Sequence, residues 1–171
     1  LQGKEAIKKL EGNYDFTEYS LKYNKINYPV PNCDLSKIQL YKPSVQDSEI
    51  LIALSRQIFN DSYKDAQSMV MKEFESEFRQ QYLATLAGEF IGMGGISFEK
   101  DGAYIFGFGI APKYQGKGFG KAMLKLMLDD LIKKNVDIIM IDVNSTNERA
   151  FNLYKKYGFK VQTAIEYYRK E

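Results

Sequence analysis

The 171-residue chain contains no histidine and only one cysteine, Cys33. Without histidine it can build neither a Ser-His-Asp nor a Cys-His nucleophilic site, and it offers no imidazole to a metal. One cysteine allows no internal disulfide and no pair of thiolates for zinc, so we expect no metal site. A lone reduced thiol is typical of cytosolic proteins, which predicts a cytoplasmic location. Any chemistry must therefore use tyrosine, carboxylate, lysine and backbone groups together with a cofactor.

Strong net charge and long apolar runs are also lacking. The chain has 24 Lys and Arg against 22 Asp and Glu, a formal net charge of +2. This charge is too small to indicate a nucleic-acid partner. No apolar run approaches the roughly 18 residues that a membrane helix needs, so no membrane partner is expected. The length fits one domain, and a hydrophobic content of 44% is enough for a full core.

The most informative stretch joins an apolar segment to an amphipathic one through a run of glycines. Residues 103–110 predict a buried strand, and apolar residues at helical spacing predict a helix over 122–132. The join is a glycine-rich turn at residues 115–121, with the sequence Gln-Gly-Lys-Gly-Phe-Gly-Lys. Because a helix start carries free backbone N–H groups and partial positive charge, this turn suits a phosphate.

Two common phosphate-binding patterns do not fit this turn. A P-loop requires glycine where Gln115 stands, and Ser or Thr where Ala122 follows Lys121. The dinucleotide fingerprint requires G-x-G-x-x-G, whereas these glycines are spaced by two residues throughout. A nucleotide-binding protein of either class is therefore disfavoured. A tight turn without a ligand stays an alternative.

Two motifs together resemble the GNAT acetyltransferase superfamily. Residues 115–120, behind Ile110-Ala-Pro112, match Gln/Arg-x-x-Gly-x-Gly/Ala and resemble the family's acetyl-CoA pyrophosphate loop. The segment Asn147-Glu-Arg-Ala-Phe-Asn-Leu-Tyr-Lys-Lys-Tyr-Gly-Phe159 resembles the family's N-x-x-A-x-x-x-Y-x-x-x-G-F helix. The resemblance covers roughly residues 38–168. It implies an α/β (α+β) GNAT fold, in which a mixed central sheet with splayed central strands is flanked by helices on both faces.

The order of the expected elements independently predicts a mixed sheet with helices on both faces. The expected strands are 38–42, the hairpin 81–87 and 90–98, 103–110, a fully buried strand at 136–143, and one or two final strands within 159–168. The expected helices are one through 50–58 that ends near Asn60, a second at 69–78, one at 122–132 and one at 147–157 that Gly158 ends.

The first 36 residues are expected to form an appendage outside a GNAT domain at 37–171. A helix is expected over residues 1–10, a strand over 16–23, and an extended turn at 28–32. Residues 17–25 faintly echo the chain end, so the appendage is either the last strand of a preceding similar domain, in a tandem protein, or an unrelated arm. Because the chain ends soon after Tyr168, either the last strand splits in two or another segment such as 16–23 completes the sheet.

The resemblance implies acetyl-CoA as the donor. Pantetheine is expected to run along residues 108–110, where Gly107 and Gly109 permit a bulge and close ligand approach. The diphosphate is expected on the N–H groups of the turn, with Phe119 in the core. Plain bulges, exposed lysines and a helix cap without a ligand stay alternatives. The residues assigned to the cofactor are Phe108, Gly109, Ile110, Gln115, Gly116, Lys117, Gly118, Phe119, Gly120, Lys121, Asn147 and Tyr154.

Two catalytic residues are expected from the resemblance, Tyr154 and Asp142. Tyr154 matches the family tyrosine that protonates the departing thiolate. With a thiol pKa near ~8.5 and a phenol pKa near ~10, full transfer is uphill by roughly 2 kcal/mol, so hydrogen bonding to the thiolate is the safer expectation. Asp142 matches the position where ribosomal-protein N-terminal acetyltransferases carry a glutamate base that acts through water. A buried structural tyrosine stays the alternative for Tyr154.

Other members of the family carry a carboxylate early on the central strand, where Tyr104 stands here. Glu99 and Asp101 flank the start of that strand, either to bind a cationic acceptor or simply as turn residues. The acceptor is expected to be a small amine or a peptide amine. Dimers are common in the family, so a homodimer is one candidate assembly. A catalytically silent acyl-CoA-binding or interaction module stays the competing hypothesis.

Overall fold

The computed structural model of the chain describes residues 12–24 and 34–170. These residues fall into two compact units, one formed by 34–139 and the other by 12–24 together with 140–170. Helices and strands are interspersed along the chain, as predicted for an α/β protein. The predictions for residues 1–10, for 28–32 and for Cys33 lie outside the described residues. Among the described residues, no helix has the length and apolar character that a membrane crossing requires.

The larger unit contains an antiparallel sheet in the order β2-β3-β4-β5. These strands are β2 (Ile38–Tyr41), β3 (Arg79–Leu86), β4 (Glu89–Glu99) and β5 (Gly102–Ile110). The predicted hairpin between β3 and β4 is confirmed. It turns at Ala87 and Gly88, both of which have positive φ, 49° and 85°. Glycine takes up this left-handed backbone without steric cost, so the turn can be two residues long.

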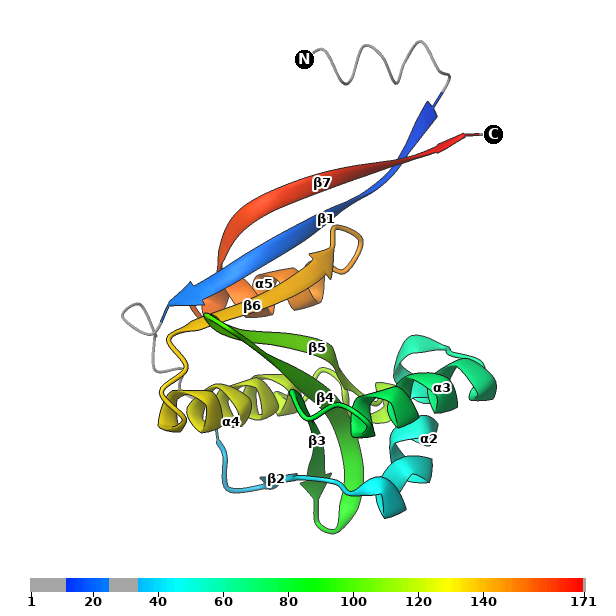
Figure 1. Cartoon of the computed structure of the whole chain (residues 1–171), viewed down its shortest axis with the longest axis vertical. Coiled ribbons are helices and arrows are strands. Elements are labelled where there is room, and N and C mark those ends of the chain that lie inside the picture. The colour runs from blue at the N-terminus through cyan, green and yellow to red at the C-terminus, as the bar shows by residue number, and fades with distance from the viewer. Residues whose placement is uncertain (1–11, 25–33, 171) are drawn as a thin grey trace. The chain divides into compact units, whose positions relative to one another are not determined.

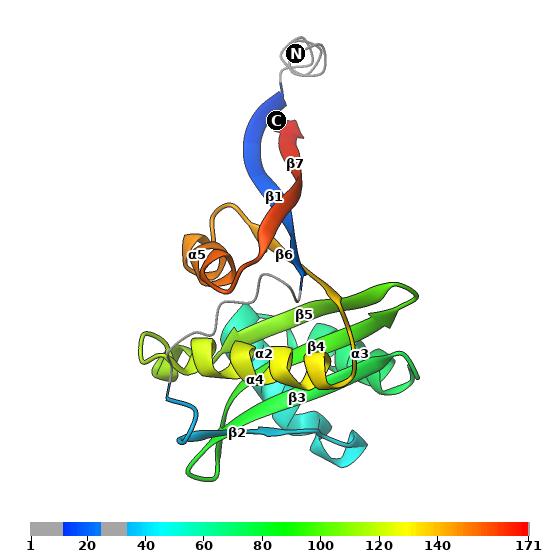
Figure 2. The same cartoon turned by 90° about the vertical axis from the view of Figure 1, so that its left-hand side faces the viewer.

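Helices cover both faces of this sheet (Figure 2). α2 (Ser48–Phe59) and α3 (Tyr63–Phe74) lie on one face, and α4 (Phe119–Lys133) lies on the other. The surroundings of two glycines in the central strands agree with helices on both faces of the sheet. A Cβ added at Gly94 would meet Met127 of α4, whereas one added at Gly109 would clash with Ile58 of α2.

The position predicted for the second helix, residues 69–78, is wrong. α3 begins six residues earlier, because Ser62 caps it: the Asp65 N–H donates to Ser62 Oγ at 3.1 Å. The helix ends at Phe74, and residues 75–78 lead into β3.

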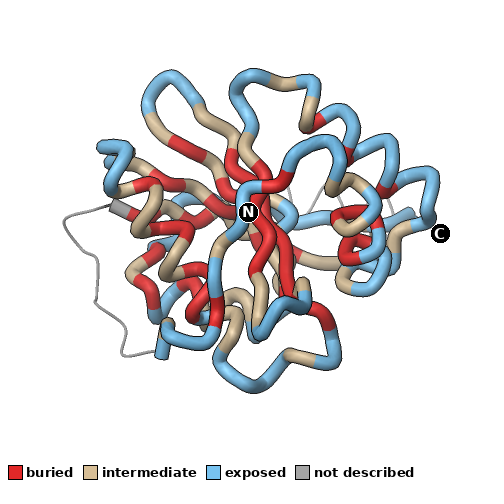
Figure 3. Tube along the Cα trace, turned by 90° about the horizontal axis from the view of Figure 1, so that it is seen from below, coloured by how far each residue is buried: buried red, intermediate tan, exposed pale blue. Residues whose placement is uncertain are grey.

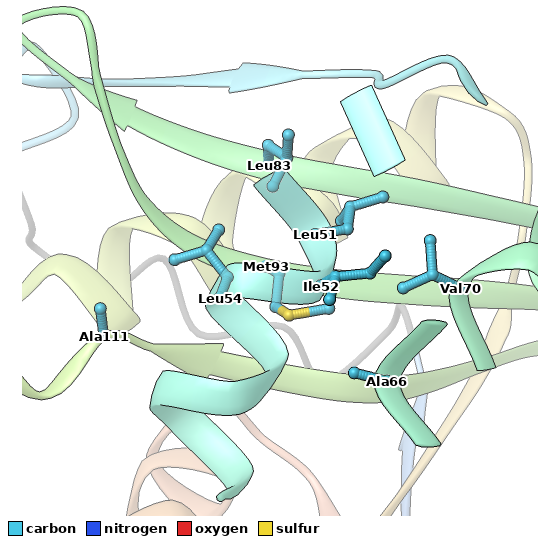
Figure 4. Packing of buried hydrophobic residues seen from close by; sticks show 8 residues of the cluster. All are labelled: Leu51, Ile52, Leu54, Ala66, Val70, Leu83, Met93 and Ala111. Carbon is cyan, nitrogen blue, oxygen red and sulfur yellow. The ribbon is translucent and has the colours of Figure 1, made fainter. Parts of the chain in front are cut away.

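One buried cluster of the larger unit lies between α2, α3 and the sheet (Figure 4), and the buried residues of α4 pack against the other face. Figure 3 marks the buried residues of the chain in red and the exposed ones in pale blue, and the red stretches gather toward the inside of the folded chain. Burying each large aliphatic side chain contributes about 1.5–3 kcal/mol, which holds the two helices against the sheet. The buried cluster consists of Leu51, Ile52, Leu54, Ala66, Val70, Leu83, Met93 and Ala111.

In the smaller unit, the strand order is β6-β1-β7. β1 (Gly12–Asn24) pairs antiparallel with β7 (Lys160–Lys170) along most of its length (Figure 1). A segment before residue 25 therefore completes this sheet, as one of the two alternatives predicted, and β7 is a single strand rather than two. Whether residues 1–36 form a separate appendage stays a prediction.

β6 (Ile138–Asn144) is not fully buried, contrary to the prediction. Its side chains alternate: Ile139, Ile141 and Val143 are buried, and the residues between them are half-buried. A period of two is what a strand shows when only one of its faces is packed against a core. The more open face carries Asp142. α5 (Glu148–Lys156) follows β6, and its Phe151 ring lies 4.9 Å from the Tyr19 ring of β1.

Candidate active site

The glycine-rich turn of the larger unit opens α4 without a side-chain cap. Gly116 and Gly118 have φ of 79° and 87°, a backbone that favours glycine, and Gly118 is the N-cap residue. The residues of the turn from Gln115 to Gly118 are exposed. Gly118 brings no oxygen of its own to the first N–H groups of α4, so a negatively charged ligand can meet them.

Side chains near the turn hold its shape. Gln115 Nε2 donates to the Ile110 carbonyl at 2.8 Å, which ties the turn to the end of β5. Lys117 Nζ donates to the Lys113 carbonyl at 3.3 Å. Phe119 is half-buried, with its ring 6.4 Å from the Tyr114 ring, so its placement in the core was wrong. The first residue of a helix whose start is exposed has too few neighbours for full burial.

Sequence reasoning missed a group of side chains that accompanies this turn. The Tyr114 hydroxyl donates to Glu89 on β4, and Lys113 Nζ lies 3.7 Å from the same carboxylate. The hydrogen bond from Tyr114, followed by the charge of Lys113, lowers the pKa of Glu89. The ammonium groups of Lys113 and Lys117 lie 5.0 and 5.8 Å from the Tyr114 ring centre. Such contacts join a turn to a distant hairpin and leave no local signal in the sequence.

β5 carries a bulge at the predicted pantetheine segment. Gly95 of β4 pairs with Phe106, but two residues earlier Met93 pairs with Gly109, so β5 contains one extra residue. The extra residue lies at Gly107-Phe108, and Gly107 has a φ of 53°. A bulge interrupts the regular ladder of hydrogen bonds at this point of the strand. The predicted splay concerns β5 and β6, and it stays a prediction.

Asp142 of β6 accepts a hydrogen bond from Ser20 of β1. Ser20 Oγ donates to Asp142 Oδ1 at 2.6 Å, and the carboxylate is half-buried. Nearby, the charge of Glu18, then burial, raises the pKa of Tyr167, and Asp142 adds a smaller contribution in the same direction. Ser20 was not anticipated, because its contact with Asp142 joins residues 122 apart in the sequence. One oxygen of Asp142 is therefore held in place by β1.

The second motif folds into α5 with both ends defined by its own residues. Asn147 is the N-cap, and its Oδ1 accepts from the Ala150 N–H at 3.1 Å. Gly158, with a φ of 87°, ends the helix as predicted, and the Phe159 N–H then donates to the Tyr154 carbonyl at 3.1 Å. The helix-cap interpretation of Asn147 is thus confirmed, and its contact with a cofactor stays a prediction.

Tyr154 is buried, with 4% of its surface exposed and its ring 5.9 Å from the Phe159 ring. Burial raises the pKa of its hydroxyl above the ordinary value. The raised pKa widens the gap to a thiol, so complete proton transfer to a thiolate is more uphill than for a free phenol. The hydroxyl is therefore better suited to donating a hydrogen bond.

The acidic residues flanking the start of β5 lie in an exposed hairpin turn. Both Glu99 and Asp101 are exposed, and Ser97 Oγ donates to Glu99 Oε1 at 3.1 Å. Tyr104, at the position where other family members carry a carboxylate, is half-buried. The role of Glu99 and Asp101 toward an acceptor stays a prediction.

A bulged strand leads here through an exposed glycine turn into an uncapped helix, an arrangement that offers backbone N–H donors to an anionic ligand. Residues 49–159 match the model of the Acetyltransferase (GNAT) family. The match covers more than half of the chain, and the chain belongs to that family.

Curated relatives are similar over shorter segments. Over 63 residues the chain is 35% identical to [ribosomal protein bS18]-alanine N-acetyltransferase of Escherichia coli (strain K12), covering 37% of this chain and 43% of that protein. Over 55 residues it is 44% identical to mycothiol acetyltransferase of Renibacterium salmoninarum, covering 32% and 16%. The chain thus spans less than half the length of either relative.

Solved structures share the fold. The GCN5-related N-acetyltransferase from Sphaerobacter thermophilus superposes with a TM-score of 0.80 over 98% of this chain and 55% of that chain, at 16% identity. At this identity the likeness shows the fold alone, and it confirms the GNAT fold predicted from the two motifs.

Proposed function

We propose that the protein is an N-acetyltransferase that transfers an acetyl group from acetyl-CoA to a primary amine by direct attack. The observation that carries this proposal is the exposed, uncapped start of α4 behind the bulge of β5, within the segment that matches the family. When bound, acetyl-CoA supplies an acetyl group already activated as a thioester. The chain's own residues then bind the donor, orient its acyl group and move protons.

The backbone of residues 115–121 holds the diphosphate in this proposal. Its exposure and the absence of a side-chain cap at Gly118 both fit an anionic group of that size. Lys117 and Lys121 are exposed and add positive charge beside the turn. The aligned N–H groups and the helix dipole together favour negative charge at this point.

The bulge of β5 orients the acyl end. Backbone groups near Phe108, Gly109 and Ile110 pair with the pantetheine arm, and one N–H there faces the thioester carbonyl. A donor aimed at developing negative charge on an oxygen typically contributes about 3 kcal/mol to the transition state. Glycine suits position 109, because a Cβ there would clash with Ile58 unless that side chain shifted.

In this proposal, Tyr154 and Asp142 donate and accept the protons of the reaction. Tyr154 donates a hydrogen bond to the sulfur as charge develops on it, and its raised pKa keeps the hydroxyl protonated for that purpose. Asp142, oriented by Ser20, accepts the proton that the amine loses. Because aspartate is one methylene shorter than glutamate, we propose that a water molecule carries the proton from the amine to Asp142.

The acceptor is a primary amine of a peptide or a small molecule. The Escherichia coli relative is named for an alanine of a ribosomal protein, which supports an N-terminal amine as the acceptor. An α-amine with a pKa near ~7.7–8.0 is partly neutral at neutral pH, whereas a lysine amine near ~10.4 is almost fully protonated. The homodimer and the cytoplasmic location stay predictions.

The test is CoA release from acetyl-CoA on offering N-terminal peptides, amino acids, polyamines and aminoglycosides. The proposal expects acceptor-dependent release for at least one class. Saturable acetyl-CoA binding with no release on any acceptor would instead support the silent acyl-CoA-binding module.

A further inference from the structure

A polar cluster lies in the larger unit, on the sheet face that α2 and α3 cover. It consists of Glu73, Arg79, Gln81 and Phe106, and we call it the Glu73 cluster. Glu73 is in the last turn of α3, with 5% of its side chain exposed. Its cationic neighbour is Arg79, whose nitrogen is 3.9 Å from Glu73 Oε1, at the outer limit of an ion pair. Burial raises the pKa of Glu73 to about 7, although the charge of Arg79 lowers it.

Gln81 adds a second acceptor that lacks a donor. Its side chain is buried, at 4% exposure, and among the described residues its Oε1 has no hydrogen-bond partner. Side chains alternate along β3, so Gln81 shares the face of Arg79 and of Leu83, which packs in the core beneath α2 and α3. Buried polar groups in folded proteins are nearly always paired, so the Oε1 of Gln81 is available to a donor from outside the chain.

An aromatic ring completes the cluster. Gln81 pairs across the sheet with Gly95, and Gly95 pairs with Phe106. The Phe106 ring occupies the space over Gly95, since a Cβ at residue 95 would clash with it. The Arg79 guanidinium lies 5.1 Å from the centre of that ring. The face of an aromatic ring attracts a cation. Glu73, Gln81 and Phe106 therefore all favour a positive charge beside them.

We propose that the Glu73 cluster binds a protonated amine of the acceptor, separate from the amine that is acetylated. This inference rests on the proposed function, which places the acyl group near Gly109. Phe106 is three residues before Gly109 on the same strand, about 10 Å along it or less where the bulge shortens the path. The ammonium replaces the guanidinium of Arg79, which is 43% exposed and can turn to solvent. It then donates to Glu73 and to Gln81 Oε1.

The substrate class that follows is an aliphatic diamine, or a peptide with a cationic group at that distance. The pair 1,6-diaminohexane and n-hexylamine isolates the second charge, because the two molecules share length and apolar surface. Calorimetric titration of each into the full chain with CoA present measures binding, and CoA release from acetyl-CoA measures turnover.

We expect the wild type to bind 1,6-diaminohexane at least tenfold more tightly than n-hexylamine. Glu73→Gln removes the charge and keeps the shape, so the ratio of kcat/KM for the diamine to that for the monoamine falls about tenfold, mainly through KM. Glu75→Gln is the matched control, because Glu75 is exposed at the same helix end. Arg79→Leu removes the competing cation, and diamine binding strengthens severalfold.

Two results overturn the inference: equal affinity for the two amines in the wild type, or diamine binding that Glu73→Gln leaves unchanged. Should Glu73→Gln fail to fold, weaker diamine binding by Arg79→Leu overturns it equally. The failure of the proposed function is a distinct result. If acetyl-CoA gives no heat while diamine binding still depends on Glu73, the cation site stands and the acetyltransferase proposal falls.

Discussion

Two ends of helices in the larger unit offer opposite kinds of hydrogen-bonding group. At the start of α4, Gly118 provides no oxygen to the first N–H groups, so this end is rich in donors. Near the end of α3, Glu73 of its last turn and Gln81 of β3 provide buried acceptors with too few donors. The starts of α3 and α5, by contrast, are capped by Ser62 and Asn147. The two proposals made above use this difference in sign: an anionic group at the start of α4 and a cationic group at Glu73.

The largest expected effect comes from placing a negative charge at the donor-rich end. Gly118→Asp puts a carboxylate where the diphosphate is proposed to bind, so acetyl-CoA affinity should fall about 100-fold, or roughly 3 kcal/mol. Gly88→Asp is the matched control. Both glycines have φ near 86° (87° and 85°), and a Cβ at either would meet no other atom within 4 Å. Equal loss of acetyl-CoA affinity in both variants would remove the turn from the site.

The buried carboxylate of Glu73 should make the stability of the protein depend on pH. Because the pKa of Glu73 rises from 4.5 to about 7 on folding, the unfolded chain loses this proton first as pH increases. The native state then holds more protons, so the free energy of unfolding falls between about pH 4.5 and 7, by about 3 kcal/mol. Denaturant titrations at several pH values measure the slope. Glu73→Gln should flatten it and Glu75→Gln should not; a slope that survives Glu73→Gln contradicts the assignment.

A third test concerns α5. Because Asn147 caps the start of this helix, its proposed contribution to the reaction comes from the Tyr154 side chain. Tyr154→Phe removes only the hydroxyl, so turnover should fall at least tenfold, or about 1.4 kcal/mol, with little change in acetyl-CoA affinity. Tyr157→Phe, another buried tyrosine at the end of the same helix, is the control and should keep its turnover. Unchanged turnover in Tyr154→Phe would leave that tyrosine a structural role only.

The smallest effects separate a cap that also serves a ligand from one that does not. Ser62→Ala and Asn147→Ala each remove a cap and should cost about 1 kcal/mol of stability. Only Asn147→Ala should also weaken acetyl-CoA binding, because the family motif assigns Asn147 to the cofactor. Thermal unfolding with and without acetyl-CoA measures both quantities. If the ligand stabilises the two variants by the same amount as the wild type, Asn147 is a cap alone.

Sequence alone predicted the features that local chemistry specifies. The turn at 115–121 and the helix from Asn147 to Gly158 depend on glycine conformations and caps that neighbouring residues supply. The helix at 63–74 was misplaced, because Ser62 caps it in a stretch whose apolar spacing is weak. Single-sided packing made β6 alternate instead of being buried on both faces.

Contacts between distant residues were beyond the sequence pattern. The pairing of β1 with β7 was one of two alternatives, because the sequence left open whether the last strand splits in two or a segment such as 16–23 completes the sheet. Ser20 beside Asp142, and Glu73 beside Arg79 and Phe106, arise only once strands and helices pack. Whether a carboxylate is buried or solvated is a tertiary property, and no spacing rule in this chain distinguishes Glu73 from Glu75.

The most direct measurement is calorimetric titration of acetyl-CoA into the purified wild-type chain. We expect saturable binding at one site, tighter than about 100 μM, which corresponds to roughly −5.5 kcal/mol. No heat at millimolar acetyl-CoA would contradict the proposal that the open start of α4 and the bulge of β5 together receive a thioester donor.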